Sequence, residues 1–382
     1  MTPQLHSKLP TVSTTIFSVM SGLAAQYRAL NLSQGFPDYP VDPVLIDLIT
    51  QHLQAGHNQY APMTGVAALR ERISQKMARV HGLAVDGDQE ITVTAGGTQA
   101  LFTAIATLVR PGDEVIVFEP AYDSYAPTVR LFGGVVVPIR LQAPDFAIDW
   151  DQVRRCITAR TRLVMVNNPN NPSGRVLDDA DVQQLAAVVA DSGAFVLSDE
   201  VYEHLVYDGR QPKTLLSHPL LRERTLTVAS FGKLLHATGW KVGYCVAAPD
   251  LMAEFRKVHQ FNVFSVHTPT QWAIADYLAD ETHYQSLSAF FQAKRDRLAA
   301  GLRDSRFRVY CPQGTYFMNL DYRDISDAPE AEFAQTLVRE HGIATIPLSA
   351  FYHDSYNQHC LRVCFAKRDA TLDQAVALLN AV

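Results

Sequence analysis

Residues 91–118 read ITVTAGGTQALFTAIATLVRPGDEVIVF. Two apolar, β-branched runs, ITVT at 91–94 and EVIVF at 114–118, flank a segment with helical spacing from Gln99 to Val109. A strand, a helix and a second strand in this order are typical of a parallel sheet, whose strands need such a crossover. Because the strand-like runs are almost entirely apolar, we expect the sheet to be covered on both faces.

The same alternation continues along the chain. Further strand-like runs lie at 135–139, 163–166, 195–197 and 225–229, and helical patterns separate them, notably at 179–192. This order predicts right-handed crossovers and a largely parallel sheet in an α/β fold. In such sheets ligands bind at the carboxyl ends of the strands, so residues that directly follow a strand are the first candidates for a site.

The pattern changes at about residue 289. A charged helical segment leads into short strands, a helix, another strand and a final helix; these lie near 307–310, 315–320, 329–341 and 361–365, with the last helix from Thr371. The last 90 or so residues therefore predict a smaller α+β domain. The first 40 or so residues have weak periodicity, and we expect them to pack against this domain.

Composition excludes several classes of protein. The 382 residues carry a net charge of −6, which does not favour a nucleic-acid or membrane-surface partner. The N-terminus lacks the apolar core of a signal peptide, and no run approaches the roughly 20 apolar residues of a membrane span. The five cysteines lack metal-finger spacing. We therefore expect a soluble cytoplasmic protein with free thiols and no structural metal.

One lysine follows a predicted strand in a tight loop. Residues 230–243 read SFGKLLHATGWKVG and come directly after the apolar run at 225–229. Lys233 is well placed there to form an imine with an aldehyde. Its amine must be neutral to attack, so burial and a nearby positive charge such as Lys241 should lower its pKa. A surface lysine in a glycine turn is the alternative that SFGK alone leaves open.

This segment resembles the cofactor-lysine signature of the class I aminotransferases, which are fold-type I enzymes that use pyridoxal 5′-phosphate. The resemblance runs from about Asn31 to the C-terminus. It implies that Lys233 is the Schiff-base lysine and proton shuttle, and that Ser230 and Lys241 bind the cofactor phosphate.

The same resemblance implies the domain arrangement. A large domain with a mostly parallel seven-stranded sheet would span residues 43–288 and bind the cofactor. The small α+β domain would span 289–382, and the N-terminal segment 1–42 would pack with it.

A carboxylate follows the strand at 195–197. Asp199 lies in LSDEVY at 197–202, and a carboxylate beside a pyridine nitrogen keeps the ring protonated and electron-withdrawing. A capping aspartate with a core tyrosine is the alternative. By resemblance, Asp199 contacts the ring nitrogen of the cofactor and Tyr202 contacts its 3-hydroxyl oxygen. The stiff turn NNPNNPSG at 167–174 supplies Asn171, which would share that oxygen; an ordinary turn is again the alternative.

A glycine turn follows the strand at 91–94. Such a turn at the start of a helix offers free N–H groups and a favourable dipole to a phosphate, although many such turns bind no ligand. By resemblance, Gly97 and Thr98 hold the cofactor phosphate and Gln99 adds a backbone donor. Tyr122, after the strand at 114–118, matches the aromatic residue that stacks on the cofactor ring; a core aromatic is the alternative.

Arg362 lies within an apolar strand-like run, LRVCF at 361–365, where it is costly to bury without a partner. A carboxylate would satisfy its planar fork. The resemblance makes this the substrate α-carboxylate, with Gly35 approaching the same group; a structural salt bridge is the alternative. Tyr60 matches a tyrosine that reaches the phosphate of the neighbouring subunit, which implies a homodimer with shared active sites.

The expected activity is the transfer of an amino group to a 2-oxo acid by ping-pong kinetics through pyridoxamine phosphate. Dicarboxylate-specific relatives carry an extra arginine, and the sequence shows no clear match to it. The plausible pocket residues are mostly apolar or aromatic: Ile16, Phe17, Tyr60, Phe264 and Tyr316. Such a pocket has a broad specificity. Residues 255–278 are similar to bacterial methionine aminotransferases of the kynurenine aminotransferase subgroup.

Methionine is therefore the favoured donor, followed by aromatic amino acids, kynurenine or glutamine. One alternative stays open, and two others agree less well with the sequence. The first is a carbon–sulfur β-lyase that uses the same cofactor, the second is a regulatory protein that only binds the cofactor, and the third is an inactive scaffold.

Overall fold

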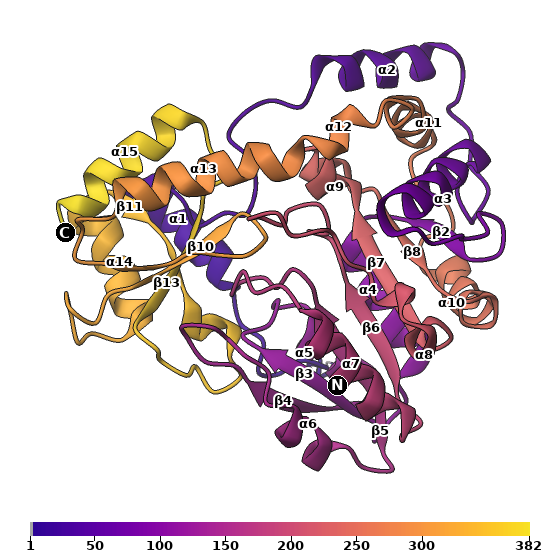
Figure 1. Ribbon diagram of the computed structural model, residues 1–382, viewed down its shortest axis with the longest axis horizontal. Helices are drawn as coiled ribbons and strands as arrows, with labels where there is room; N and C mark the ends of the chain where they lie inside the picture. Colours follow the sequence, from indigo (N-terminus) through magenta and orange to yellow (C-terminus); the bar gives the residue numbers. More distant parts are fainter. Residues whose placement is uncertain (1–2) are drawn as a thin grey trace.

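A seven-stranded sheet forms the centre of the computed structural model, which describes residues 3–382 (Figure 1). Its strand order is β2-β8-β7-β6-β5-β3-β4. The strands are β2 (Ile91–Thr94), β3 (Glu114–Glu119), β4 (Val135–Arg140), β5 (Thr161–Asn167), β6 (Phe195–Asp199), β7 (Thr225–Ser230) and β8 (Gly243–Val246). Strand β8 runs antiparallel to both its neighbours, and the other pairs are parallel. The predicted α/β fold with a mostly parallel sheet is confirmed.

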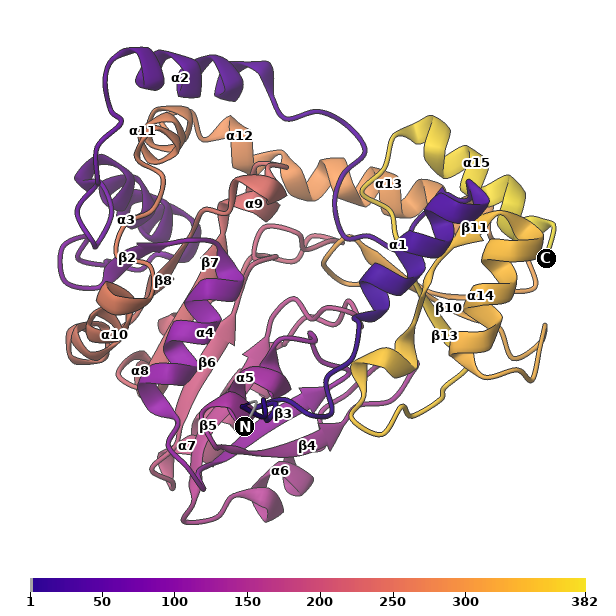
Figure 2. The ribbon, with the colours of Figure 1, turned by 180° about the vertical axis from the view of Figure 1, so that it is seen from behind.

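Helices cover both faces of this sheet, as the two opposite views show (Figures 1 and 2). They are α3 (Ala67–His81), α4 (Gly97–Leu108), α5 (Tyr125–Leu131), α6 (Trp150–Cys156), α7 (Asp179–Ala190), α8 (Pro219–Arg222), α10 (Pro249–Asn262) and α11 (Thr268–Tyr277). Alternate strand residues enter two separate apolar clusters: Val164 and Val166 join one, and Leu163 and Met165 the other. This two-sided burial explains why the strands are almost wholly apolar.

A second, antiparallel sheet lies in the C-terminal part of the chain, with strand order β12-β13-β10-β9. Its strands are β9 (Arg308–Tyr310), β10 (Phe317–Asp321), β12 (Ile346–Pro347) and β13 (Cys360–Cys364), and the helices of this part are α13 (Leu287–Gly301), α14 (Glu330–His341) and α15 (Asp369–Asn380). Helix α13 leads from the large sheet to α15 (Figure 1). Strand β10 starts at Phe317 rather than at 315, because Thr315 has a left-handed φ of 66°.

The N-terminal segment forms a helix that the weak periodicity did not predict. Helix α1 (Ile16–Tyr27) starts at Thr15, whose side chain accepts a hydrogen bond from the Ser18 N–H, and it packs against α14. Strand β1 (Leu30–Asn31) then pairs in parallel with β11 (Ile343–Ala344). Residues 16–31 are thereby joined to the C-terminal part of the chain.

The remaining helices are α2 (Pro43–Gln54), α9 (Phe231–Leu234), α12 (Thr282–Gln285) and the 3-10 turns η1 (Leu215–Ser217), η2 (Thr238–Trp240) and η3 (Leu348–Phe351). Helix α2 packs on α11. All five cysteines are free. Between residues 3 and 382, no helix is both long and apolar enough to span a membrane.

Candidate active site

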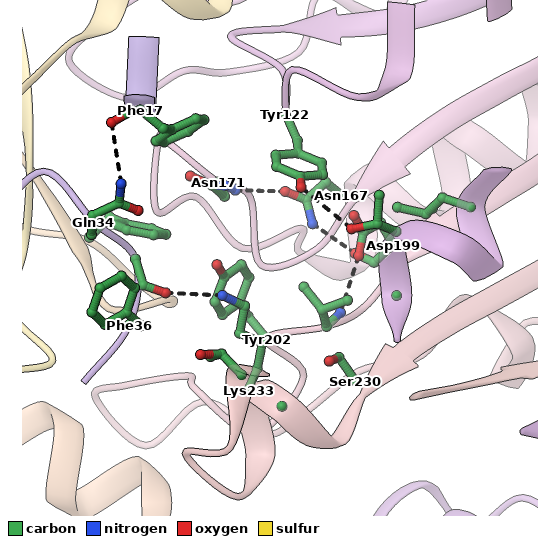
Figure 3. A pocket seen from close by; sticks show the side chains of 18 of the residues that line it. Phe17, Gln34, Phe36, Tyr122, Asn167, Asn171, Asp199, Tyr202, Ser230 and Lys233 are labelled. Carbon is green, nitrogen blue, oxygen red and sulfur yellow. Dashed lines mark hydrogen bonds between the residues drawn. The ribbon is translucent and has the colours of Figure 1, made fainter. Parts of the chain in front are cut away.

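A cavity of about 370 Å³ lies at the carboxyl ends of the parallel strands. Twelve of the fourteen predicted site residues line it: Phe17, Gly35, Gly97, Thr98, Tyr122, Asn171, Asp199, Tyr202, Ser230, Lys233, Lys241 and Arg362. Figure 3 shows most of their side chains around the same space. Residues that are up to 345 positions apart in the sequence, from Phe17 to Arg362, thus meet in one pocket.

The sheet explains why these residues meet. Asp199 is the last residue of β6 and Ser230 the last of β7, and these two strands are parallel neighbours. Asn167 ends β5 on the other side of β6. Because parallel strands end at the same edge, each strand delivers a polar side chain to the cavity. Lys233 follows on the short helix α9 directly after β7.

The amine of Lys233 is buried among polar groups. Its Nζ donates hydrogen bonds to the carbonyl oxygen of Gly35 at 3.0 Å and to the hydroxyl oxygen of Tyr316 at 2.9 Å. Burial lowers the pKa of Lys233 to about 8, and the positive charges of Arg362 and Lys241 act in the same direction. A useful fraction of the amine is therefore neutral near pH 7, as a nucleophile or base requires.

Asp199 is buried and accepts two hydrogen bonds. The hydroxyl of Tyr125 donates to one carboxylate oxygen and the Val201 N–H to the other, at 3.3 Å. Burial raises the pKa of Asp199 to about 6, although the Tyr125 hydrogen bond lowers it. Both observed donors are neutral, so a positively charged group entering the cavity would stabilise this carboxylate.

Tyr125 is a site residue that sequence reasoning missed. It comes three positions after Tyr122, in the first turn of α5, and is 3% exposed. The run YDSY at 122–125 contains both tyrosines, but an aromatic residue near a helix start reads equally well as core. Its partner Asp199 lies 74 positions away, and local sequence carries no sign of that contact.

Asp199→Asn is expected to stabilise the ligand-free fold at neutral pH. The pKa of Asp199 rises from 3.8 to about 6 on folding, so between these values the folded chain binds more protons than the unfolded chain. Stability therefore falls as the pH rises through this window, by at most about 3 kcal/mol. The asparagine variant should regain part of this lost stability at pH 7.5 and none at pH 3.5. Urea unfolding of both proteins at the two pH values would measure the difference in the free energy of unfolding. A variant that is less stable than the parent at pH 7.5 would contradict the account.

The glycine turn before α4 opens one end of the cavity. Gly96 has a φ of 81°, and a Cβ placed there would lie 3.4 Å from the Nζ of Lys241. Gly97 begins the 12-residue helix α4, whose first N–H groups lack partners within the helix. With Thr98, Ser230 and Lys241 on the same wall, this end suits a phosphate-like dianion.

Two aromatic side chains border the middle of the cavity. The hydroxyl of Tyr122 lies 3.4 Å from the Oγ1 of Thr98, so the ring stands beside the glycine turn (Figure 3). Tyr202, from the loop after β6, lies near Lys233, whose Nζ is 5.5 Å from the centre of its ring. Both rings could contact a flat aromatic ligand in the cavity.

Arg362 holds the other end of the cavity and is 1% exposed. Its guanidinium donates to the Oδ1 of Asn171 and to the carbonyl oxygen of Ser33, both at 2.8 Å. Neither partner is charged, so these contacts do not form the structural salt bridge that the sequence left open. Burial lowers the pKa of Arg362 to about 10, which leaves it cationic at neutral pH. An incoming carboxylate would supply the missing negative charge.

Three aromatic rings surround this guanidinium. Its central carbon lies 3.9 Å from the ring centre of Phe317, 5.2 Å from Phe351 and 5.3 Å from Phe17. The amide of Gln34 donates to the carbonyl oxygen of Phe17 and so joins the start of α1 to the cavity wall (Figure 3). The surroundings of the bound carboxylate would therefore be apolar.

Two of the fourteen predicted site residues, Gln99 and Tyr60, lie outside the cavity lining, as do Ile16, Phe264 and Tyr316, which the sequence suggested for the substrate pocket. The side chain of Gln99 folds back, with its oxygen accepting from the Ala95 N–H and its nitrogen donating to Thr103. Tyr60 is 83% exposed and its ring packs edge-on against Phe264 at 5.4 Å. Tyr60 therefore lies on the outer surface of the chain, where a second protein molecule could contact it.

Known proteins with similar sequences are aminotransferases. Residues 27–379 match the family described as aminotransferase class I and II. The chain is 51% identical to the methionine aminotransferase of Escherichia coli (strain K12), over 98% of this chain and 97% of that protein. It is 38% identical, over 98% and 97%, to a protein of Mycobacterium tuberculosis (strain ATCC 25618 / H37Rv) named probable N-succinyldiaminopimelate aminotransferase.

Solved structures agree with the sequence comparison. An Escherichia coli protein, whose structure and reactivity are described as identifying a methionine aminotransferase function, superposes with a TM-score of 0.98. The sequence identity is 49%, and the match covers 100% of each chain. The whole described fold is thus shared with that protein.

Proposed function

Because the chain belongs to the class I and II aminotransferases and is a pyridoxal-phosphate-dependent enzyme, we propose that it transfers the amino group of methionine and of aromatic amino acids to a 2-oxo acid. One observation carries the proposal. A lysine of lowered pKa lies in the same cavity as a buried carboxylate and an arginine that has no charged partner there. A bound cofactor or substrate could contact each of these three groups.

The lining residues fit pyridoxal phosphate. We propose that Lys233 binds its aldehyde carbon, Asp199 its ring nitrogen, and Tyr202 and Asn171 its 3-hydroxyl oxygen, with Tyr122 against the ring. The proposed phosphate ligands are Gly97, Thr98, the Gln99 backbone, Ser230, Lys241 and Tyr60 of a second copy. When bound, the cofactor withdraws electrons from the substrate Cα and so weakens its C–H bond.

The residues of the chain then have distinct tasks. Arg362 holds the substrate α-carboxylate by its planar fork, with the Gly35 backbone close to the same group, and this fixes the Cα near Lys233. The neutral amine of Lys233 takes the Cα proton and afterwards returns it as an ammonium group. Asp199 would stay negative beside a protonated ring nitrogen of the cofactor. Its carboxylate would keep that nitrogen protonated, and the protonated ring withdraws electrons more strongly. Two half-reactions in sequence should give ping-pong kinetics.

The cavity wall supports apolar donors. Phe17, Phe36 and Phe317 line it on the side of Arg362, and Arg362 is the one arginine among its lining residues. A donor with a second carboxylate would bury that charge against aromatic rings, which is costly. Kynurenine and glutamine stay possible donors, because an apolar pocket separates related side chains by roughly 1–3 kcal/mol per methylene.

We further propose a homodimer with shared active sites. Tyr60, at 83%, is unusually exposed for an aromatic residue and packs against the partly exposed Phe264; Phe261, three positions before Phe264 in the sequence, is 90% exposed. Large exposed apolar side chains in one place are typical of an interface. A cytoplasmic location and the division into residues 1–42, 43–288 and 289–382 remain predictions of the sequence.

A donor panel tests the proposed substrate class. The holoenzyme is mixed in turn with methionine, phenylalanine, tyrosine, kynurenine, glutamine, aspartate and N-succinyl-diaminopimelate, and the rate of cofactor amination is read by absorbance. We expect methionine to react fastest and the acidic donors about 100-fold or more slowly, as for a pocket that must desolvate an unpaired charge. A faster reaction with aspartate or N-succinyl-diaminopimelate than with methionine would refute the proposed donor class and leave the aminotransferase activity intact.

A further inference from the structure

The amine of Lys233 occupies a small polar site of its own. Its two acceptors, the Gly35 carbonyl oxygen and the Tyr316 hydroxyl oxygen, are also hydrogen-bonded to each other at 2.6 Å. Tyr316 is 1% exposed, and its ring stands edge-on to that of Tyr202 at 5.2 Å. The sequence suggested Tyr316 as part of the substrate pocket, whereas the structure places its hydroxyl in contact with the lysine.

Chemistry fixes the direction of the hydrogen bond between Tyr316 and Gly35. A tyrosine hydroxyl has one hydrogen, and here it points to the Gly35 carbonyl oxygen. Burial raises the pKa of Tyr316 well above its usual value, so this hydrogen stays in place. Tyr316 therefore presents a lone pair to Lys233 and acts as an acceptor. Gly35, which has no hydrogen on its carbonyl, accepts from both side chains.

Because Gly35 and Tyr316 both accept hydrogen bonds, they restrict the direction of the lysine lone pair. A neutral amine has two hydrogens and one lone pair, and the two acceptors, 2.6 Å apart on one side of the nitrogen, bind at least one of these hydrogens. The lone pair must then point away from both of them. Lys233 also lines the cavity, so a lone pair that points away from both acceptors can face the space where ligands bind. A nucleophile or base is most effective when its lone pair is already aimed at its target.

The backbone that carries Tyr316 is held in an unfavourable conformation. Thr315 is buried and has a φ of 66°, which is rare for a β-branched residue and costs free energy. Its N–H donates to the Leu205 carbonyl oxygen at 3.0 Å, and its own carbonyl oxygen accepts from the Tyr207 hydroxyl. Two contacts to the loop after β6 thus impose the turn that directs Tyr316 toward Lys233.

We propose that Tyr316 is a positioning residue for Lys233. It holds the amine, whenever the lysine is not bonded to the cofactor, with its lone pair facing the cavity. The inference rests on the proposed role of Lys233 as the cofactor lysine. It concerns how fast that amine attacks an aldehyde and takes a proton, and it is independent of which amino acid is the donor.

Capture of the cofactor by the apoenzyme tests the proposal without any amino acid. In this step the lysine nitrogen forms a bond to the aldehyde carbon of pyridoxal phosphate, and water leaves with the aldehyde oxygen. We expect Tyr316→Phe to slow the first-order rate at saturating cofactor by about 3- to 10-fold, the effect of one lost hydrogen bond. Stopped-flow absorbance measures the rate, and the final cofactor content gives the fraction of competent sites.

Tyr322→Phe is the matched control. Tyr322 is as deeply buried, and its hydroxyl also donates to a backbone carbonyl oxygen, that of Ala328 at 2.7 Å, but it lies at the end of β10 away from the cavity. Both variants should lose similar thermal stability. A purely structural Tyr316 would lower stability or the fraction of competent sites and leave the capture rate of the remaining sites unchanged, and this result would overturn the proposal.

A second measurement follows the proton. The amination half-reaction is run with methionine and with Cα-deuterated methionine, and the primary isotope effect is compared between variants. In Tyr316→Phe a misdirected lysine should make proton removal slower and the isotope effect larger, while Tyr322→Phe keeps the parent value. An unchanged isotope effect together with an unchanged rate would also overturn the proposal. If methionine proves not to be a donor, the capture experiment alone tests the role of Tyr316. The proposed donor class and the proposed role of Tyr316 can therefore fail separately.

Discussion

Lys233→Ala is expected to lower the transamination rate by roughly 10⁴-fold or more, because one substitution removes both the cofactor bond and the general base. The absorbance of the lysine-bound cofactor should vanish, although the phosphate ligands can still retain the cofactor. Thermal stability should stay the same or rise, because a buried amine whose pKa is lowered to about 8 is a cost to folding near neutral pH.

Two controls separate this effect from misfolding. Lys257→Ala removes an exposed lysine on α10 and should leave both absorbance and rate unchanged. A small primary amine in solution should restore part of the rate to Lys233→Ala, since it can occupy the vacated space and accept the Cα proton. Normal turnover of Lys233→Ala in the absence of added amine would refute the proposed role of the lysine.

Arg362→Lys is expected to lower kcat/KM for the amino-acid donor by roughly 10²- to 10³-fold, which corresponds to about 3–4 kcal/mol for a lost bidentate contact in a buried site. The substitution keeps the positive charge but cannot reproduce two parallel N–H donors. The guanidinium also holds Asn171 and the Ser33 carbonyl oxygen, so some disorder of the cavity wall should follow. Cofactor absorbance should remain, because Arg362 is not a proposed cofactor ligand.

A donor without a carboxylate provides the control for Arg362. The amine that corresponds to methionine but lacks this group should react slowly with the parent enzyme, and about equally slowly with Arg362→Lys. The loss caused by the mutation and the loss caused by removing the carboxylate should therefore not add, as expected when two groups contact each other. Additive losses would show that Arg362 acts by some route other than binding the α-carboxylate.

The parts of the site that the sequence predicted are those coded locally. Asp199, Ser230 and Lys233 each follow an apolar run, and a parallel sheet brings strand ends together whatever the details of packing. The glycine turn at Gly96 is also local, since its left-handed φ restricts the residue type. The order of the strands and helices is enough to predict that these residues lie close together.

The parts that the sequence did not predict depend on distant contacts. Tyr125 donates a hydrogen bond to Asp199, 74 positions away. The sequence suggested Tyr316 only for the substrate pocket, and its contacts with Lys233 and Gly35 join residues up to 281 positions apart. A tyrosine at either position is compatible with an ordinary core. Only the packed structure shows which hydroxyl meets which charged group, because neither hydrogen bond leaves a pattern in the neighbouring sequence.

One further difference, the helix in the N-terminal segment, also depends on distant contacts. Helix α1 depends for its stability on packing against α14, and short helices are marginal without such contacts.

A single turnover with methionine tests the central claim most directly. The holoenzyme is mixed with an excess of L-methionine and no oxo acid, and the cofactor absorbance, the 2-oxo acid and ammonia are measured together. We predict one equivalent of 2-oxo-4-methylthiobutanoate per active site, complete conversion of the cofactor to its aminated form, and no ammonia. Continuing release of ammonia and of a 2-oxo acid without an acceptor would identify a lyase, and an unchanged cofactor spectrum would identify an inactive scaffold; either result would contradict the account.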